Sequence, residues 1–69
     1  MNNILMLNDK IKKSGKKKTY LAEKCGLSRA GFLNCINNKA EFRSSHIEIL
    51  CNELNINSLR EKESIFFAK

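Results

Sequence analysis

The chain has 69 residues, of which 42% are hydrophobic, and a formal net charge of +6. This length suffices for one small domain with a modest core, so we expect a single domain spanning residues 1–69. No apolar run approaches the roughly 18 residues of a membrane span, and the first ten residues lack the basic start of a signal peptide. We therefore expect a cytoplasmic protein that does not bind membranes.

The positive charge is concentrated in the first part of the chain. Residues 1–39 contain nine Lys and Arg against two acids, net +7, whereas residues 40–69 contain four against five, net −1. A basic surface attracts polyanions by releasing their condensed counterions, so this asymmetry favours a nucleic-acid partner. The alternative is that the charge serves only solubility.

The residue types argue against catalysis and metal binding. The sequence has one histidine, His46, and its cysteines, Cys25, Cys35 and Cys51, form no CxxC pair, so no four-ligand zinc site is evident. It also has no phosphate-binding glycine loop and no Ser/His/Asp set. We expect no enzyme activity, no metal and no cofactor, with the three cysteines reduced and packed on apolar helix faces.

The first predicted helix covers residues 3–14. Ile4, Leu7 and Ile11 recur on one face, as in an amphipathic helix. Gly15 is expected to end this helix, because glycine enters the left-handed region without steric cost.

A run of three lysines follows and overlaps the start of the next helix. Lysine is unfavourable there, because a helix N-terminus already carries partial positive charge, unless an anion lies nearby. We therefore interpret Lys16, Lys17 and Lys18, with the neighbouring Thr19, as a phosphate-binding segment. The alternative is a solvated charge run on a flexible link.

Residues 18–37 are predicted to form two short helices joined by a tight turn. Ala22 is small where the two helices cross, Gly26 suits the turn, and Ser28 is a good N-cap for the second helix. The inward-facing positions are apolar: Leu21, Cys25, Leu27, Phe32, Cys35 and Ile36.

This arrangement resembles the helix-turn-helix of the phage repressor/Cro (Xre-like, lambda-repressor-like) family. The resemblance covers the twenty residues of the motif, and the predicted helices on either side extend it over nearly the whole chain. It implies an all-α, compact bundle of about five short helices. It also implies a sequence-specific transcriptional regulator of phage or prophage type, which binds double-stranded operator DNA as a homodimer.

The resemblance places the third helix in the major groove. Arg29 is suited to a bidentate bond with guanine and Asn34 to one with adenine. Ala30 and Gly31 form no side-chain hydrogen bonds, so either the helix backbone approaches the groove closely, or specificity comes from DNA shape or is low. The implied base-contact residues are Ser28, Arg29, Ala30, Gly31, Leu33 and Asn34.

The family often has Asn-Gly-Lys after the third helix, in a loop that grips phosphate. Asn37 and Lys39 match this pattern, and Asn38 replaces the glycine as the expected left-handed cap. The resemblance therefore implies phosphate contacts from Asn37 and Lys39, and from Arg43 beyond them.

Two further helices are predicted in the last third of the chain. Ser44 or Ser45 is expected to start the first of them, where Ser45-x-x-Glu48 has capping-box spacing. Ser58-x-x-Glu61 opens the last, which runs through about residue 67. Phe66 and Phe67 lie about 100° apart on that helix, so the core can bury one more easily than the other. Both are candidate dimer contacts, because an exposed aromatic would suit a dimer interface, and the alternative is that both fill the core.

The sequence leaves a second function open. The same fold serves as a protein-interaction module, such as an antirepressor or an inhibitor of a host nuclease, with the basic face docking an acidic surface. The small Ala30 and Gly31 favour this alternative, and RNA or nonspecific DNA binding is a third. A specific regulator loses affinity when its operator is scrambled, a nonspecific binder does not, and a docking module copurifies with a partner.

Overall fold

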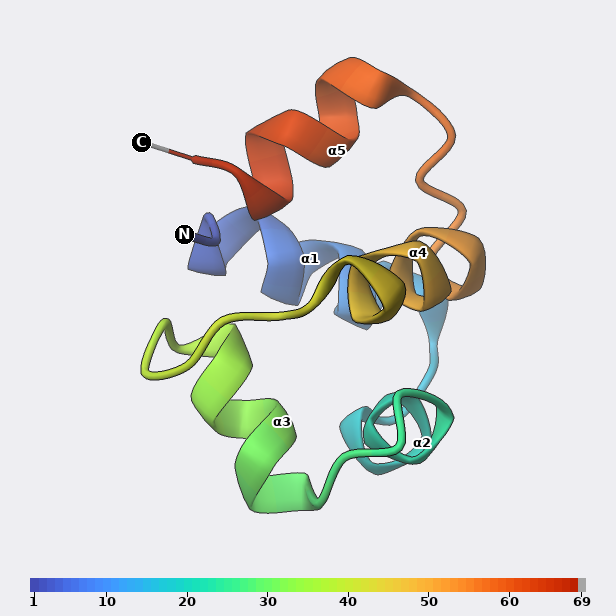
Figure 1. Ribbon diagram of the computed structural model, residues 1–69. Helices are drawn as coiled ribbons and strands as arrows, with labels where there is room; N and C mark the ends of the chain where they lie inside the picture. Colours follow the sequence, from blue (N-terminus) through green and yellow to red (C-terminus); the bar gives the residue numbers. More distant parts are fainter. Residues whose placement is uncertain (69) are drawn as a thin grey trace.

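The computed structural model describes residues 1–68, which form a bundle of helices (Figure 1). The five helices of these residues are α1 (Ile4–Ser14), α2 (Lys18–Lys24), α3 (Arg29–Ile36), α4 (Ser44–Glu53) and α5 (Leu59–Phe66). The radius of gyration of the Cα atoms is 10.6 Å, close to the roughly 11 Å expected for a compact domain of this length. The prediction of an all-α bundle of about five short helices is confirmed. Lys69, the last residue of the predicted domain, lies outside the described residues.

A residue with positive φ, in the left-handed region, follows each of the first four helices. These residues are Gly15, Gly26, Asn38 and Asn55. The glycines adopt positive φ without steric cost, and asparagine tolerates it better than most residues. The predictions for Gly15, Gly26 and Asn38 are confirmed, whereas the role of Asn55 was not predicted.

Polar side chains begin three of the helices. Asn3 caps α1, Ser28 caps α3 by accepting the Gly31 N–H at 3.0 Å, and Ser58 caps α5. These bonds satisfy backbone donors that have no partner within the helix. The predicted caps at Ser28 and Ser58 are confirmed.

The start of α4 agrees with the prediction, but its cap does not. The helix begins at Ser44, one of the two predicted residues, with Arg43 as its N-cap, so the capping box predicted to begin at Ser45 is wrong. Instead, Nδ1 of His46 accepts the Arg43 backbone N–H at 3.2 Å. The imidazole thus supplies the acceptor that Glu or Gln usually provides at this position.

The core lies where the five helices converge. The Phe42 ring, just before α4, packs edge-to-face on Phe32 and on Phe66, at centroid distances of 5.8 and 6.1 Å. Largely or fully buried apolar side chains complete it, including Leu7, Leu21, Ile36, Leu50 and Ile65. Within residues 1–68, no helix combines the length and apolar character needed to cross a membrane.

The two C-terminal phenylalanines have different environments. Phe66 is 2% exposed and belongs to the core, so its prediction as a dimer contact is wrong. Phe67 follows the last residue of α5 and is 54% exposed. Neighbouring positions of a helix point about 100° apart, so Phe67, the C-cap of α5, projects away from the core that Phe66 enters.

Candidate nucleic-acid interface

The α2–α3 pair forms one side of the bundle, at the bottom of Figure 1. The turn between the helices is fixed by Gly26, with φ of 69°, and by the Leu27 N–H, which donates to the Ala22 carbonyl at 2.9 Å. Ala22 is buried, so its small side chain allows close packing. The helix, turn and helix predicted from the sequence are therefore present, and α3 lies at the surface.

The predicted base-contact residues share the outer part of α3. Ser28, Arg29, Ala30 and Asn34 are exposed, and Gly31 and Leu33 are half-buried. The hydroxyl of Ser28 accepts a backbone N–H, so its own proton stays free to donate to a ligand. The structure thus brings these six residues together on one helix, with the side chains of Arg29 and Asn34 accessible.

Gly31 is the third residue of α3 and lies next to the side chain that caps the helix. A Cβ atom at this position would lie 3.1 Å from the Ser28 hydroxyl oxygen, closer than most such contacts. A serine cap tolerates a larger residue there, as Glu61 shows behind Ser58 in α5, so the cap does not require Gly31. The glycine costs the helix about 1 kcal/mol relative to alanine, and the cap offsets a similar amount.

Three of the twelve lysines and arginines in residues 1–68 form salt bridges, and nine do not; Lys12, Arg60 and Lys62 are the three of these nine that lie outside residues 17–43. Salt bridges neutralise three lysines that lie outside α2 and α3, in the pairs Lys10–Glu61, Lys13–Asp9 and Lys16–Glu53. Between residues 17 and 43, by contrast, six exposed cations form no ion pair within residues 1–68. We call these six the unpaired cations: Lys17, Lys18, Lys24, Arg29, Lys39 and Arg43. The same span contains two acids, so its net charge is +4.

Lys16 differs from the other residues predicted to contact phosphate. Its ammonium donates to the Glu53 carboxylate and to the Glu53 backbone carbonyl, both at 2.8 Å. This hydrogen bond to Lys16 is also the main reason why the pKa of Glu53 is lowered. Lys16 therefore ties the α1–α2 connection to the end of α4, and we leave it out of the proposed interface.

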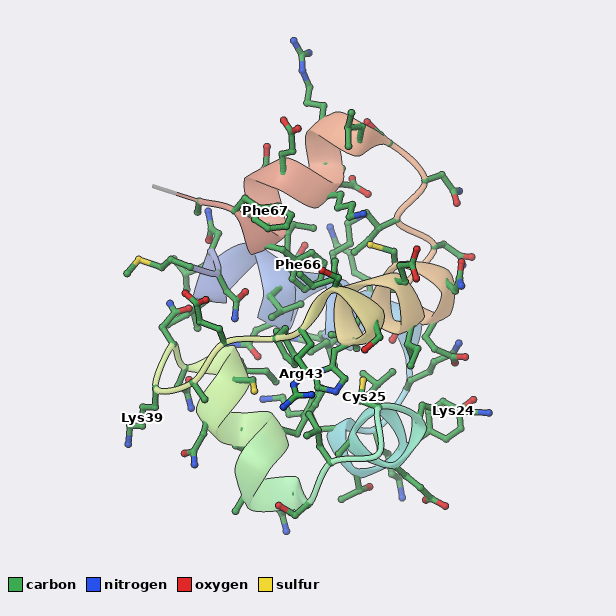
Figure 2. All side chains as sticks on the ribbon, in the orientation of Figure 1. Lys24, Cys25, Lys39, Arg43, Phe66 and Phe67 are labelled. Atoms are coloured by element: carbon green, nitrogen blue, oxygen red, sulfur yellow. The ribbon has the colours of Figure 1, made fainter. Side chains whose placement is uncertain are left out.

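The remaining predicted phosphate contacts are at the surface. Lys17 is the N-cap of α2 and makes no side-chain capping bond, and Lys18 and Thr19 follow it, exposed. Lys39 projects outward from the turn after α3, and Arg43 extends from the start of α4 towards the α2–α3 pair (Figure 2). Exposed cations therefore lie on the chain segments before and after α3.

Sequence reasoning missed the contact that secures the end of α3. The Asn38 carboxamide accepts the Asn2 N–H at 2.7 Å and donates to the Asn2 carbonyl at 3.0 Å. The Asn2 side chain in turn donates to the Cys35 carbonyl at 2.6 Å. The positive φ of Asn38 was predictable, but no sequence signal joins two residues this far apart.

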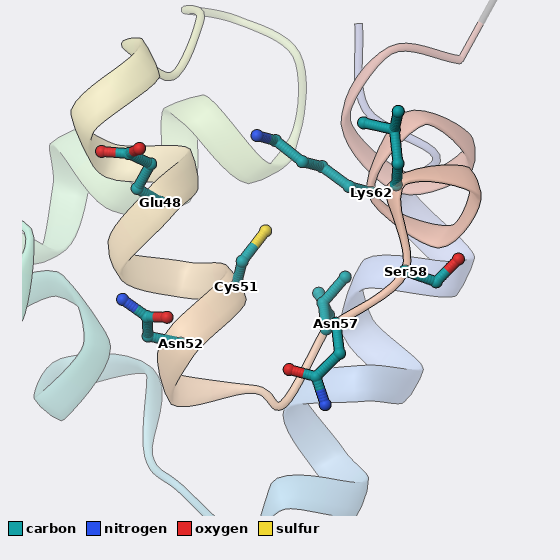
Figure 3. Close-up of a pocket in the computed structure, with 8 residues that line it drawn as sticks. Glu48, Cys51, Asn52, Asn57, Ser58 and Lys62 are labelled. Atoms are coloured by element: carbon teal, nitrogen blue, oxygen red, sulfur yellow. The ribbon is translucent and has the colours of Figure 1, made fainter.

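A groove of about 420 Å³ lies between α4 and α5, away from α3 (Figure 3). The Cys51 thiol and the Lys62 ammonium line it, together with Glu48. Burial raises the pKa of the Cys51 thiol, and likewise those of Cys25 and Cys35, so these thiols are protonated and weakly nucleophilic at neutral pH. Residues 1–68 bring no three His, Cys, Asp or Glu side chains together as a metal site.

Comparisons with protein-family models, with curated proteins and with solved structures found no match. The resemblance to repressor/Cro helix-turn-helix proteins therefore stays a prediction. The functional argument rests on the exposed residues of α3 and on the unpaired cations around it.

Proposed function

We propose that the protein is a sequence-specific DNA-binding transcriptional regulator of the phage or prophage repressor/Cro type. One observation carries the proposal: the segment from Lys17 to Arg43, which contains α3, has six exposed cations without an ion pair in residues 1–68 and only two acids. An α-helix with its side chains is about 10–12 Å in diameter. The major groove of B-DNA is about 12 Å wide and admits one helix.

In this proposal, α3 lies in the major groove and its side chains read base edges. Arg29 pairs with guanine and Asn34 with adenine, each pair contributing about 1–3 kcal/mol of discrimination. The small Ala30 and Gly31 let the helix approach the bases closely. Phosphate contacts orient the domain, and they come from Lys17, Lys18, Thr19, Asn37, Lys39 and Arg43.

The proposal includes a homodimer in the cytoplasm that covers a two-fold operator and blocks transcription. Half-sites of such operators lie about one helical turn apart. Phe67 is the candidate dimer contact, because it is exposed and a second exposed apolar residue, Met1, lies nearby. The two are close because the N–H of Ala68, the residue after Phe67, donates to the carbonyl of Met1 at 2.9 Å.

The test is a selection from random duplexes, followed by fluorescence anisotropy with the selected duplex and a shuffled duplex of equal composition. We expect a preference of about 100-fold, equivalent to about 2.7 kcal/mol. Arg29→Ala should reduce this preference about tenfold or more while leaving affinity for the shuffled duplex nearly unchanged. The reason is that Arg29 reads bases in this proposal, whereas phosphate contacts supply the nonspecific term.

Lys17→Ala should weaken binding to both duplexes equally and lower the salt slope by about one unit. Arg60→Ala is the matched control, because Arg60 is an exposed cation on α5, at the other end of the bundle (Figure 1). Equal binding to both duplexes by the wild-type protein would identify a nonspecific binder. Absence of binding at low salt would favour the protein-interaction module instead.

A further inference from the structure

The N-terminal segment, residues 1–3, is bonded to the turn that follows α3. The Asn38 carboxamide pairs with both backbone groups of Asn2, accepting its N–H at 2.7 Å and donating to its carbonyl at 3.0 Å. We call this contact the Asn2–Asn38 pair. Two bonds to a single residue fix the position and also the orientation of the Asn38 side chain.

The N-terminal segment is itself anchored on two helices. The Asn2 side chain is 9% exposed and donates to the Cys35 carbonyl in α3 at 2.6 Å. The Asn3 N–H donates to the Ile65 carbonyl in α5 at 2.7 Å. The turn after α3 is therefore connected through residues 1–3 to the far side of the bundle.

Lys39 follows Asn38 directly, so its backbone position depends on that of Asn38. The Lys39 N–H donates to the Asn34 carbonyl at 2.8 Å, and the Ala40 N–H donates to the same oxygen at 3.2 Å. These bonds hold the backbone, while the ammonium projects outward from the turn (Figure 2). Lys39 has no acidic partner within residues 1–68, so the turn presents an available cation at the end of α3.

We propose that the Asn2–Asn38 pair positions Lys39 against a DNA phosphate, so that the N-terminal segment controls one contact of the interface. This inference rests on the proposed DNA-binding function. Asn38 and Asn2 are positioning residues in it, because they act through the Lys39 ammonium and do not touch the DNA themselves.

The chain offers a matched pair of variants. Asn38→Gly keeps the left-handed turn, since glycine adopts positive φ freely, and deletes the carboxamide. Asn55→Gly makes the same change after α4, where the asparagine also has positive φ but is exposed. Circular dichroism at the assay temperature checks that both variants are folded. If Asn38→Gly unfolds, Asn2→Ser loosens the pair indirectly, because it removes the bond from the Asn2 side chain to the Cys35 carbonyl that anchors the N-terminal segment on α3.

The experiment measures affinity for the selected duplex at about 50 and 200 mM salt. Lys39→Ala should lower the salt slope by about 0.9, which makes the change in affinity between these salts about 3.5-fold smaller. Asn38→Gly should lower the slope by a similar amount, and Asn55→Gly should not. In the double variant, Asn38→Gly should add nothing to Lys39→Ala, because the pair acts through that lysine.

Additive effects, or an unchanged slope in Asn38→Gly, would overturn the proposal and leave the pair with a purely structural role. A lower salt slope in Asn38→Gly but not in Lys39→Ala would overturn the proposal as well. The proposed DNA binding by α3 would not be affected by that result. If the wild-type protein bound no DNA, the proposed function would fail. Amide hydrogen exchange at Lys39 and Ala40 then still tests the pair: equal protection in wild type and Asn38→Gly would show that it does not hold the turn.

Discussion

The turns after α3 and α4 have the same backbone design but are secured differently. Each contains a left-handed asparagine, and each closes with a 2.8 Å bond from the next residue back into the helix: Lys39 N–H to Asn34 O, and Ile56 N–H to Cys51 O. This is the long-range bond of the Schellman motif, which is often accompanied by an apolar contact from the same residue. The turn after α4 has that contact, because Ile56 is 5% exposed and belongs to the core.

The turn after α3 has an exposed lysine where the other has the buried isoleucine. Because the Lys39 side chain is exposed, it cannot anchor its turn in the core as Ile56 does. The Asn2–Asn38 pair replaces this anchor with hydrogen bonds from outside the turn. The comparison indicates that the turn after α3, which lacks an apolar anchor, is held by a polar attachment from elsewhere in the chain, and that the side chain of Asn38 matters there as well as its positive φ.

The largest expected effect comes from removing the apolar anchor. Ile56→Ala should lower the free energy of unfolding by about 2–5 kcal/mol, because it empties a buried site. Lys39→Ala, at the equivalent position, should change it by no more than about 0.5 kcal/mol, since that side chain is exposed. Urea denaturation followed by circular dichroism measures both. If Ile56→Ala does not fold, Ile56→Val should still cost about 0.5–1.5 kcal/mol.

A similar cost for the two alanine variants would show that Ile56 does not anchor its turn. The comparison would then lose its basis, and the two turns would differ only in sequence.

The second effect concerns the asparagines themselves. Asn38→Gly should lower the free energy of unfolding by about 1–3 kcal/mol, because two hydrogen bonds disappear and the Asn2 backbone groups lose their partners. Asn55→Gly should stay within about 0.5 kcal/mol of wild type, since it removes an exposed side chain from an equivalent backbone. The same urea titrations measure both. Equal destabilisation by the two variants would contradict the distinction between the turns.

The sequence predicted what depends on neighbouring residues. The helical period located all five helices, and glycine, asparagine and serine located most of their ends. The cap of α4 was missed because capping-box rules look for Glu or Gln, whereas His46 provides the acceptor here. The angle of about 100° between Phe66 and Phe67 predicted that they would differ in burial, but which of the two faces the core depends on how α5 packs against the bundle.

The candidate site was predictable for the same reason, and only in part. Most base and phosphate residues lie within one continuous segment, so their common exposure follows from the helix-turn-helix pattern. The pairing of Lys16 with Glu53, and of Asn2 with Asn38, brings together residues that are 37 and 36 positions apart. Such contacts come from the packing of the whole bundle, which local patterns do not encode.

The smallest expected effect tests the other attachment of the turn after α4. Lys16 bonds both the carboxylate and the carbonyl of Glu53, which is the last residue of α4. Lys16→Met keeps most of the apolar stem and removes the charge, so it should lower the free energy of unfolding by less than Asn38→Gly does. Most surface ion pairs contribute little.

The pH dependence identifies the cause of this small effect. The pKa of Glu53 is lowered from its ordinary 4.5 by the bond from Lys16, so the folded state favours the ionised carboxylate. The stabilisation is therefore present above the ordinary pKa and is lost as the pH falls through the lowered one. Urea titrations of wild type and Lys16→Met should differ at pH 7 and converge on acidification, and Lys12→Met, which removes an exposed lysine of α1, is the control. A difference that persisted at low pH would mean that the bond to the Glu53 carbonyl, which does not titrate, holds this turn.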